Sequence, residues 1–489
     1  MSSPSQPPSP ASRSAGIALR RGLALVLFDL IAPGSAQIAA GNKHAGRPAF
    51  RLWQASVAMV LLLLVVALIA PGFLSMVYFN PITLTILAWG VPIIGIGWGL
   101  LLLDAWRIAN PRQMSAKGKV FSGSLALVLA FAVTGTSVVA YGFFDGQASF
   151  VGDVLQGGGA TEVQQGRYNI LLLGGDAAGS RPGIRPDSMT VASIDAATGR
   201  TVLFSLPRNL QRAPFPKDSP LYSKYPNGYW CKSQECLLNA VYTLADNNKK
   251  LFPGDKYPGV TATAGVIEEI LGLKINYWAM VDLSGFRHLI DALGGIRLDI
   301  GKRVPIGSLN SKKGVYGWIE PGKNVHLDGF NALWFARSRE YSSDYERMVR
   351  QKCVMNAMVK QLDPVQVITN FNDIAKASGK TVATNLSADQ IPTMLTLATL
   401  MKDLPMASVS FTPPLIKPVK PDFEKIRAVV ADAIAESEAK DEAATAQPSA
   451  SQPSAPANGS ASAKPKPKPS ASSSKNRTDD LDDICKVSK

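Results

Sequence analysis

The stretch "YNILLLGGDAAGSRPGIRPDSMTVASIDAATGRTVLFSLPRN", residues 168–209, decides the fold class of this sequence. Its first part, residues 168–175, is an aliphatic run that is typical of a buried strand. Residues 188–195 and 200–207 have strand-like composition and flank the turn sequence AATG, which predicts a β-hairpin. The stretch therefore predicts a buried strand followed by a hairpin.

Helical and strand-like patterns alternate after this stretch. Periodicity and capping signals predict helices at 235–248, 260–273, 284–295, 326–335, 343–362, 363–376, 387–402 and 421–438. Further strands are predicted at 276–283, 295–300 and 406–412. Ser284 is the expected cap of one helix, and Ser343 or Asp344 that of another. This alternation predicts an α/β domain in which helices flank a central mixed sheet.

Three long apolar runs precede the domain. They cover residues 53–75, 81–103 and 120–143. Each exceeds the ~18 residues that distinguish a membrane span from a buried core helix, so we expect three transmembrane helices. Residues 22–41 are also apolar, but Asp29 and Pro33-Gly34 interrupt them. An interfacial or re-entrant helix is expected there, with a fourth span as the alternative.

The positions of lysine and arginine predict the orientation of these spans. Six precede the first run and four lie between the second and third, whereas residues 76–80 have none. Because such residues stay on the cytoplasmic side, residues 104–119 are expected inside and everything after residue 144 outside the cell. This topology accounts for most of the formal charge of +14. No nucleic-acid partner is expected, since the charged residues of the domain lie outside the membrane.

The sequence thus predicts five segments. They are a cytoplasmic region (1–52), the membrane spans (53–143), a Gly-rich stalk (144–166), the extracellular α/β domain (167–439) and a tail (440–489). The tail is rich in Ala, Pro, Ser and Lys, a composition that buries little apolar surface and predicts disorder. Its end, Ile484-Cys485, is interpreted as an anchor.

All four cysteines lie after the third span, which fits an oxidising exterior. Cys231 and Cys236 enclose a short loop and are expected to pair, leaving Cys353 with Cys485. The alternative is that one or more of them are free thiols.

Charged residues gather at the predicted strand ends and in one later segment. The first group comprises Asp176, Arg185, Asp187 and Arg208. The second lies in "FARSREYSSDYERMVRQ", residues 335–351, and comprises Arg337, Arg339, Arg347 and Arg350. Ligands of α/β sheets bind at strand ends, and arginine forks bind phosphate oxygens through two hydrogen bonds each. The pattern therefore indicates a pyrophosphate, with the aspartates beside it holding Mg²⁺.

A structural interpretation of the same residues remains open. An isolated charge at a strand end is usually a surface residue or an ion-pair partner. Asp344 and Glu346 are also close enough in sequence to neutralise Arg347 and Arg350.

Residues 169–209 and 326–351 together resemble the LytR–CpsA–Psr family of Gram-positive envelope proteins, in the order and spacing of that family. The resemblance covers roughly residues 167–363. It implies a phosphotransferase that moves a glycopolymer from a polyprenyl-diphosphate carrier to peptidoglycan or a related wall acceptor. It also implies Mg²⁺ as cofactor and an apolar pocket for the polyprenyl tail.

The resemblance also assigns roles to individual residues. Asp176 and Asp187 match the carboxylates on the metal side, and Arg185 and Arg208 match phosphate ligands beside them. Arg337 and Arg339 match the pyrophosphate-binding pair, and Arg347, Arg350 and Gln351 match the helix that follows. The chain departs from the family in Asn209, in Leu237 and in having three expected spans in place of one.

The implied reaction is attack by an acceptor sugar hydroxyl on the phosphorus next to the glycopolymer, with polyprenyl phosphate leaving. Arginines and Mg²⁺ would spread the developing charge, and Asp176 could accept the hydroxyl proton. Two alternatives remain open: a pyrophosphatase that acts on the same lipid, and a non-catalytic scaffold that binds envelope glycan or lipid.

Overall fold

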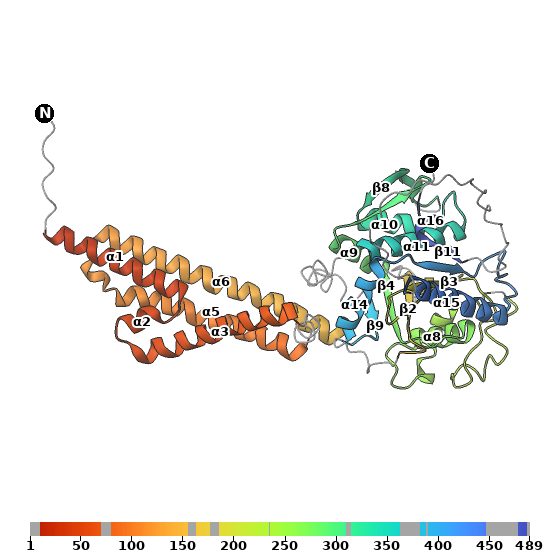
Figure 1. Ribbon diagram of the computed structural model, residues 1–489, viewed down its shortest axis with the longest axis horizontal. Coiled ribbons are helices and arrows are strands. Elements are labelled where there is room, and N and C mark those ends of the chain that lie inside the picture. The colour runs from red at the N-terminus through yellow and green to blue at the C-terminus, as the bar shows by residue number, and fades with distance from the viewer. Residues whose placement is uncertain are drawn as a thin grey trace, which may run out of the picture. The chain divides into compact units, whose positions relative to one another are not determined.

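The computed structural model describes residues 10–69, 80–154, 163–176, 185–233, 235–309, 314–361, 382–387, 390–445 and 478–486. The chain divides into two compact units, Met1–Asp153 and Val154–Lys489. The first unit consists of helices, and the second combines a sheet with helices (Figure 1).

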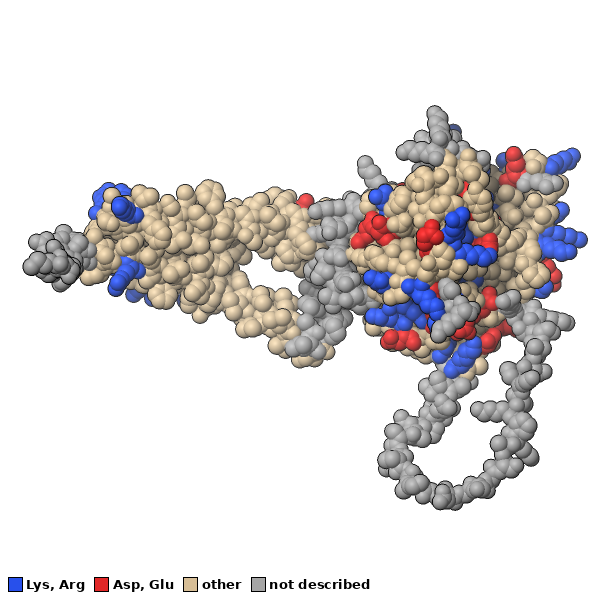
Figure 2. All heavy atoms as spheres, turned by 90° about the horizontal axis from the view of Figure 1, so that it is seen from above, with Lys and Arg blue, Asp and Glu red and all other residues tan. Residues whose placement is uncertain are grey.

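The described elements of the first unit are helical. They are α1 (Pro10–Ile31), α2 (Ser35–Ala39), α3 (Lys43–Ile69), α5 (Pro81–Ile108), the short 3-10 helix η1 (Pro111–Gln113) and α6 (Ala116–Val154). Segments of α3, α5 and α6 are long and apolar enough to cross a membrane. Figure 2 shows few charged side chains along these helices and a group of lysines and arginines at one end of the unit. The prediction of three long apolar helices is confirmed.

The boundaries of these helices differ from the predicted ones. α3 begins at Lys43, before the predicted start at residue 53. α6 continues to Val154, so the predicted stalk (144–166) is helical in its first part. Single glycines cost only about 1 kcal/mol each inside a helix, too little to end it. The apolar stretch 22–41 is divided between α1 and α2, as its interruption predicted, and its place at the membrane interface stays a prediction.

The second unit is organised around a mixed seven-stranded sheet, in the order β11-β10-β3-β2-β1-β4-β9. The strands are β1 (Arg167–Asp176), β2 (Arg185–Asp195), β3 (Thr201–Leu206), β4 (Tyr277–Asp282), β9 (Val382–Thr384), β10 (Ala407–Ser410) and β11 (Asp479–Asp480). β1, β2 and β3 are antiparallel, whereas β4 runs parallel to β1 and β10 parallel to β3. The predicted buried strand and hairpin are therefore confirmed as β1 and β2–β3.

Helices cover both faces of this sheet. They are α7 (Ala240–Asn247), α8 (Pro258–Leu271), α9 (Leu283–Ala292), α10 (Gly329–Arg337), α11 (Asp344–Gln361), α14 (Ile391–Lys402), α15 (Phe423–Thr445) and α16 (Leu481–Ile484), with the 3-10 helix η2 (Lys249–Leu251). α7, α8 and α15 share one core with alternate residues of β1, β2 and β3. The opposite face packs against α11, α14 and α16 (Figure 1). This arrangement confirms the predicted α/β class.

Two small sheets lie beside the central one, and of their four strands the sequence predicted only the one at 295–300. β5 (Ile296–Ile300) pairs with β8 (Gly322–Leu327), and β6 (Val304–Gly307) pairs with β7 (Val315–Ile319). β8 takes the first residues of the helix predicted at 326–335, because Asp328 caps α10 through the Asn331 N–H. Similarly, Asp282 and not Ser284 caps α9, through the Gly285 N–H. The helix predicted at 363–376 lies outside the described residues.

The end of the chain folds back onto the sheet. β11 pairs with β10 and forms the edge of the sheet, and Leu481, which follows it, is fully buried. Both predicted disulfides are present, Cys231–Cys236 and Cys353–Cys485. The prediction of disorder over 440–489 is therefore wrong at both ends, since α15 reaches Thr445 and residues 478–486 are folded, whereas the interpretation of Ile484-Cys485 as an anchor agrees with the disulfide. Burial of Leu481 and the disulfide explain the second difference.

Candidate functional site

A largely apolar cavity of about 340 Å³ lies between the central sheet and helices α9, α10 and α11. Its apolar wall is formed by Leu172, Ala279, Val281, Phe286, Leu289, Leu333, Ala336, Val354, Met355 and Met358. These residues come from β1, β4 and the three helices, so the walls depend on the packing of the whole layer. A hydrocarbon chain suits such a cavity, because each buried methylene contributes about 0.8 kcal/mol.

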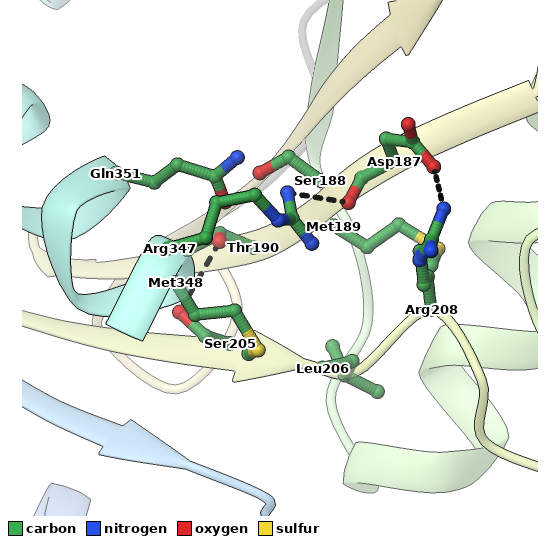
Figure 3. A pocket seen from close by; sticks show the side chains of 10 residues that line it. All are labelled: Asp187, Ser188, Met189, Thr190, Ser205, Leu206, Arg208, Arg347, Met348 and Gln351. Atoms are coloured by element: carbon green, nitrogen blue, oxygen red, sulfur yellow. Dashed lines mark hydrogen bonds and ion pairs between the residues drawn. The ribbon is translucent and has the colours of Figure 1, made fainter. Parts of the chain in front are cut away.

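Polar residues meet at one part of this cavity. They are Asp187, Ser188, Arg337, Arg339, Arg347 and Gln351. A small adjoining pocket shares Asp187, Arg347 and Gln351 and is completed by Arg208 (Figure 3). The cavity therefore combines an apolar interior with a rim rich in arginine.

Asp187 is the centre of the rim. Its Oδ1 accepts a hydrogen bond of 2.6 Å from Arg208 Nη1, and its Oδ2 accepts one of 3.1 Å from Arg339 Nη2. Arg347 Nη1 donates to the main-chain oxygen of Asp187 at 3.3 Å (Figure 3). One strand residue thus brings together arginines from the end of β3, the α10–α11 loop and α11.

Arg347 is held from the opposite side by Asp344. Its Nε and Nη2 donate to the two carboxylate oxygens of Asp344 at 3.1 and 3.2 Å. Arg347 is only 2% exposed, and this burial lowers its pKa, while the Asp344 carboxylate opposes the shift. Because an arginine stays protonated in proteins, a buried positive charge is fixed at the rim. The neutralisation by Asp344 that the sequence left open is therefore present.

Arg350 does not line the cavity or the small pocket. It donates to the main-chain oxygens of Phe335 and Ser338, and so holds the end of α10. Gln351 lies at the cavity and also donates to the Ala336 oxygen at 3.2 Å. The Arg350 side chain thus turns towards carbonyls left free by the helix end and has a structural role there, while its predicted pyrophosphate contact stays a prediction.

A reciprocal capping box begins α11. The Glu346 N–H donates to Ser343 Oγ, and the Ser343 N–H donates to Glu346 Oε2. Of the two expected caps, Ser343 has this role, while Asp344 remains available for the arginines. Lys352, next along the helix, is buried and donates to Ser408 and Ser410, away from the rim.

Asp176 and Arg185 lie at the ends of β1 and β2. The register pairs Asp176 with Arg185, and Arg185 precedes Asp187 by two residues in β2. The Asp176 side chain is outside the described part of the chain, as are residues 177–184 between the two strands. Arg185 is exposed and does not line either pocket. Within the described residues, no group of three or more metal-binding side chains is present.

The resemblance implied an apolar pocket, but sequence reasoning did not identify the residues of the apolar wall, because they have the pattern of an ordinary core. It also missed Asp282, which lines the cavity and caps α9. The alternation that places Leu172 and Thr190 on the face of the sheet towards α11 was visible in β1 and β2. However, nothing in that pattern shows that the helices leave space above this face.

This fold and site define an α/β protein suited to an amphiphile with an anionic head group, whose apolar part fits the cavity and whose acidic part meets the arginines. The chain belongs to the LytR_cpsA_psr family, whose model matches residues 151–414. The resemblance found in the sequence is confirmed.

Curated relatives include a protein of Bacillus mycoides named polyisoprenyl-teichoic acid–peptidoglycan teichoic acid transferase TagU, 28% identical over 225 residues. The protein of the same name from Oceanobacillus iheyensis is 28% identical over 230 residues. These matches cover 46% and 47% of this chain, which spans about 62% of the length of each relative.

Similar solved structures include TagV of B. subtilis and protein gbs0355 of Streptococcus agalactiae. The first is 22% identical, with a TM-score of 0.40 over 56% of this chain and 99% of TagV. The second is 23% identical, with a TM-score of 0.40 over 50% of this chain and 76% of the other.

Proposed function

We propose that the protein transfers a glycopolymer from a polyprenyl-diphosphate carrier to peptidoglycan or a related wall acceptor. The observation that supports this most is the apolar cavity whose rim holds Arg337, Arg339 and Arg347. A polyprenyl chain has the chemistry of the interior, and a diphosphate has that of the rim. The family and the names of the TagU relatives agree with this assignment.

In this reaction the acceptor hydroxyl oxygen forms a bond to the phosphorus that bears the glycopolymer. The bond from that phosphorus to the bridging oxygen breaks, and polyprenyl phosphate leaves with the electron pair. The hydroxyl proton passes to a carboxylate, for which Asp176 at the end of β1 is the proposed acceptor. The product is a phosphodiester between glycopolymer and acceptor.

The arginines would stabilise the charge that develops on the phosphate oxygens. Arg208 and Arg339 both form ion pairs with Asp187. These contacts keep the two guanidinium groups near each other although they repel. A diphosphate offers the same groups more acceptor oxygens, so binding would exchange some of these contacts for phosphate contacts. Arg185 is proposed to reach the ligand from the β2 side.

Mg²⁺ is the proposed cofactor. Asp187 has a carboxylate that is 31% exposed at the rim, and the register places Asp176 close by. Carboxylates together with diphosphate oxygens are the way Mg²⁺ is usually bound, which supports the proposal that Asp187 and Asp176 would hold the ion. When bound, the ion would neutralise part of the diphosphate charge.

We further propose that the second unit lies outside the cell. The support is the distribution of lysine and arginine around α3, α5 and α6, which favours a cytoplasmic N-terminus and a cytoplasmic α5–α6 connection. The membrane then holds the unit on the side where both peptidoglycan and an oxidising environment for the disulfides are found.

The test is a reconstituted reaction with the full chain in nanodiscs, Mg²⁺, a synthetic polyprenyl-diphosphate glycan and a peptidoglycan oligosaccharide. If the protein is a transferase, the reaction should yield a product joined by a phosphodiester and free polyprenyl phosphate. Neither should form when the protein is left out. Release of glycan phosphate whether or not acceptor is present would instead identify a pyrophosphatase. Tight binding without any product would identify a scaffold.

A further inference from the structure

Four aromatic side chains form two neighbouring pairs close to the rim. Tyr316 and Trp318 lie on one face of β7, because residues two apart in a strand point the same way. Trp318 packs on Tyr341 with ring centroids 5.8 Å apart, and Tyr316 meets the edge of Trp334 at 6.3 Å. The two pairs are therefore about 7 Å apart along the strand. We call these four residues the aromatic strip.

Guanidinium groups accompany both pairs. Arg303 lies 4.1 Å from the ring centre of Trp318, and Arg337 lies 5.9 Å from that of Trp334. Arg337 also lines the apolar cavity. One end of the aromatic strip is thus joined to the candidate diphosphate site by a single side chain.

Tyr341 joins the other end to the same site. It follows Arg339 by two residues in the α10–α11 loop, and its side chain is 73% exposed. Its φ is 56°, a left-handed conformation that is unfavourable for a bulky residue. The loop is held in place because Glu340 accepts hydrogen bonds from Ser308 Oγ and the Leu309 N–H. A strained, exposed aromatic residue in a fixed loop indicates a binding role.

We propose that the aromatic strip binds the glycan of the donor, beginning with the sugars next to the diphosphate. This inference rests on the proposed function and extends it to the sugar part of the substrate. One face of a pyranose ring presents C–H groups, which pack against the negative face of an aromatic ring. The continuity of the strip with Arg337 and Arg339 favours the donor, because its diphosphate would lie at those residues. The nearby arginines also favour an anionic glycopolymer.

Exposed aromatic residues could alternatively contact the membrane surface. Leu309 allows the two explanations to be separated, because it is 57% exposed and lies beside the Glu340 contact. A membrane contact would use this aliphatic side chain, whereas stacking of sugars would not.

The experiment measures binding of three probes to the full chain in nanodiscs. They are geranylgeranyl diphosphate, the same lipid bearing one N-acetylglucosamine, and the same lipid bearing a tetrasaccharide. We expect affinity to rise with the saccharide. Tyr341→Ala should weaken the affinity for the saccharide-bearing probes by about two- to tenfold and leave the affinity for geranylgeranyl diphosphate unchanged. Trp318→Ala should act in the same direction, whereas Tyr341→Phe and Leu309→Ala should bind all three probes like the parent.

Other results would overturn the inference. Equal losses for all three probes in Tyr341→Ala, together with a loss in Leu309→Ala, would indicate a membrane contact. A loss confined to a lipid-free peptidoglycan oligosaccharide would assign the strip to the acceptor. Affinity that does not rise with the saccharide in the parent protein would reject the strip as a glycan site, while the transfer reaction decides the proposed function separately.

Discussion

Arg339 and Asp187 are separated by 152 positions in the sequence, and Arg339 Nη2 donates to Asp187 Oδ2 at 3.1 Å. The first belongs to the loop between α10 and α11, and the second lies near the start of β2. The other oxygen of the same carboxylate accepts from Arg208. Three distant parts of the chain therefore converge at the rim, and the contact supplies the first prediction.

Arg339→Ala is expected to lower the rate of transfer by about tenfold to a hundredfold. The reason is the loss of a charge-assisted fork, for which each hydrogen bond contributes about 1.5–3 kcal/mol. Arg337→Ala should act similarly, and Arg339→Lys should restore only part of the rate, because lysine provides a point charge in place of a fork. The measurement is kcat/KM for the reconstituted reaction, with thermal melting of each variant.

Arg350→Ala is the matched control, because this arginine donates to carbonyls and not to Asp187. It is expected to lower the melting temperature more than Arg339→Ala does, while the folded fraction still binds the lipid diphosphate. Full transfer by a well-folded Arg337→Ala, Arg339→Ala double variant would contradict the assignment of the rim to the diphosphate.

Asp187→Asn is expected to slow transfer at least as much as Arg339→Ala. The amide keeps the shape of the carboxylate but loses its charge, so it binds Mg²⁺ poorly. The dependence of the rate on Mg²⁺ concentration should therefore shift to higher concentration or flatten. An Asn variant that is slow but has the parent's Mg²⁺ dependence would show that Asp187 only positions Arg208 and Arg339.

The sequence indicated the charged residues that meet at the rim better than the cavity beside them. The ends of β2, β3 and α11 were recognised in the sequence. In the structure these ends lie close together, which brings together Asp187, Arg208, Arg339 and Arg347. Arg350 is also an arginine and lies on the same helix as Arg347, yet its side chain donates to an α10 carbonyl. This orientation depends on where α10 ends, which the sequence did not show. Hairpin β6–β7 was not predicted, and with it the aromatic strip was missed.

A third prediction concerns Lys352, which is 1% exposed and donates to Ser408 and Ser410. Burial lowers its pKa from the ordinary 10.5, against the attraction of Asp479. Between the lowered value and pH 10.5 the unfolded chain holds a proton that the folded protein has released. This lysine's contribution to the free energy of unfolding therefore rises with pH across that window.

Lys352→Met removes the buried charge and isolates this effect. The free energy of unfolding of the variant minus that of the parent should be largest at neutral pH and should decrease as the pH approaches 10.5. Denaturant unfolding of both proteins over this range measures the difference, in which the other titrating groups cancel. A difference that does not change with pH would mean that Lys352 keeps its ordinary pKa.

A fourth prediction tests the orientation in the membrane. A reporter enzyme that is active only outside the cell should work when fused after Val154, the end of α6. The same reporter should be inactive when fused after Gln113, in the connection between α5 and α6. The reverse pattern would place the second unit in the cytoplasm and remove peptidoglycan as an acceptor.

The last prediction compares the two disulfides. Cys353–Cys485 joins residues 132 apart, whereas Cys231–Cys236 joins residues 5 apart. In the chain-entropy model the longer loop stabilises the fold by about 5 kcal/mol and the shorter by about 2 kcal/mol, although measured values are often smaller. Cys485→Ser should therefore lower the free energy of unfolding more than Cys231→Ser. It should also release β11 and α16, because Leu481 is buried only while the tail stays on the sheet.

Denaturant unfolding gives the two stabilities, and hydrogen exchange of β10 reports the loss of its partner strand. Each comparison is repeated in reductant, where parent and variants should become nearly alike. Equal losses for the two variants, or full protection of β10 in Cys485→Ser, would show that tail packing alone holds the end of the chain.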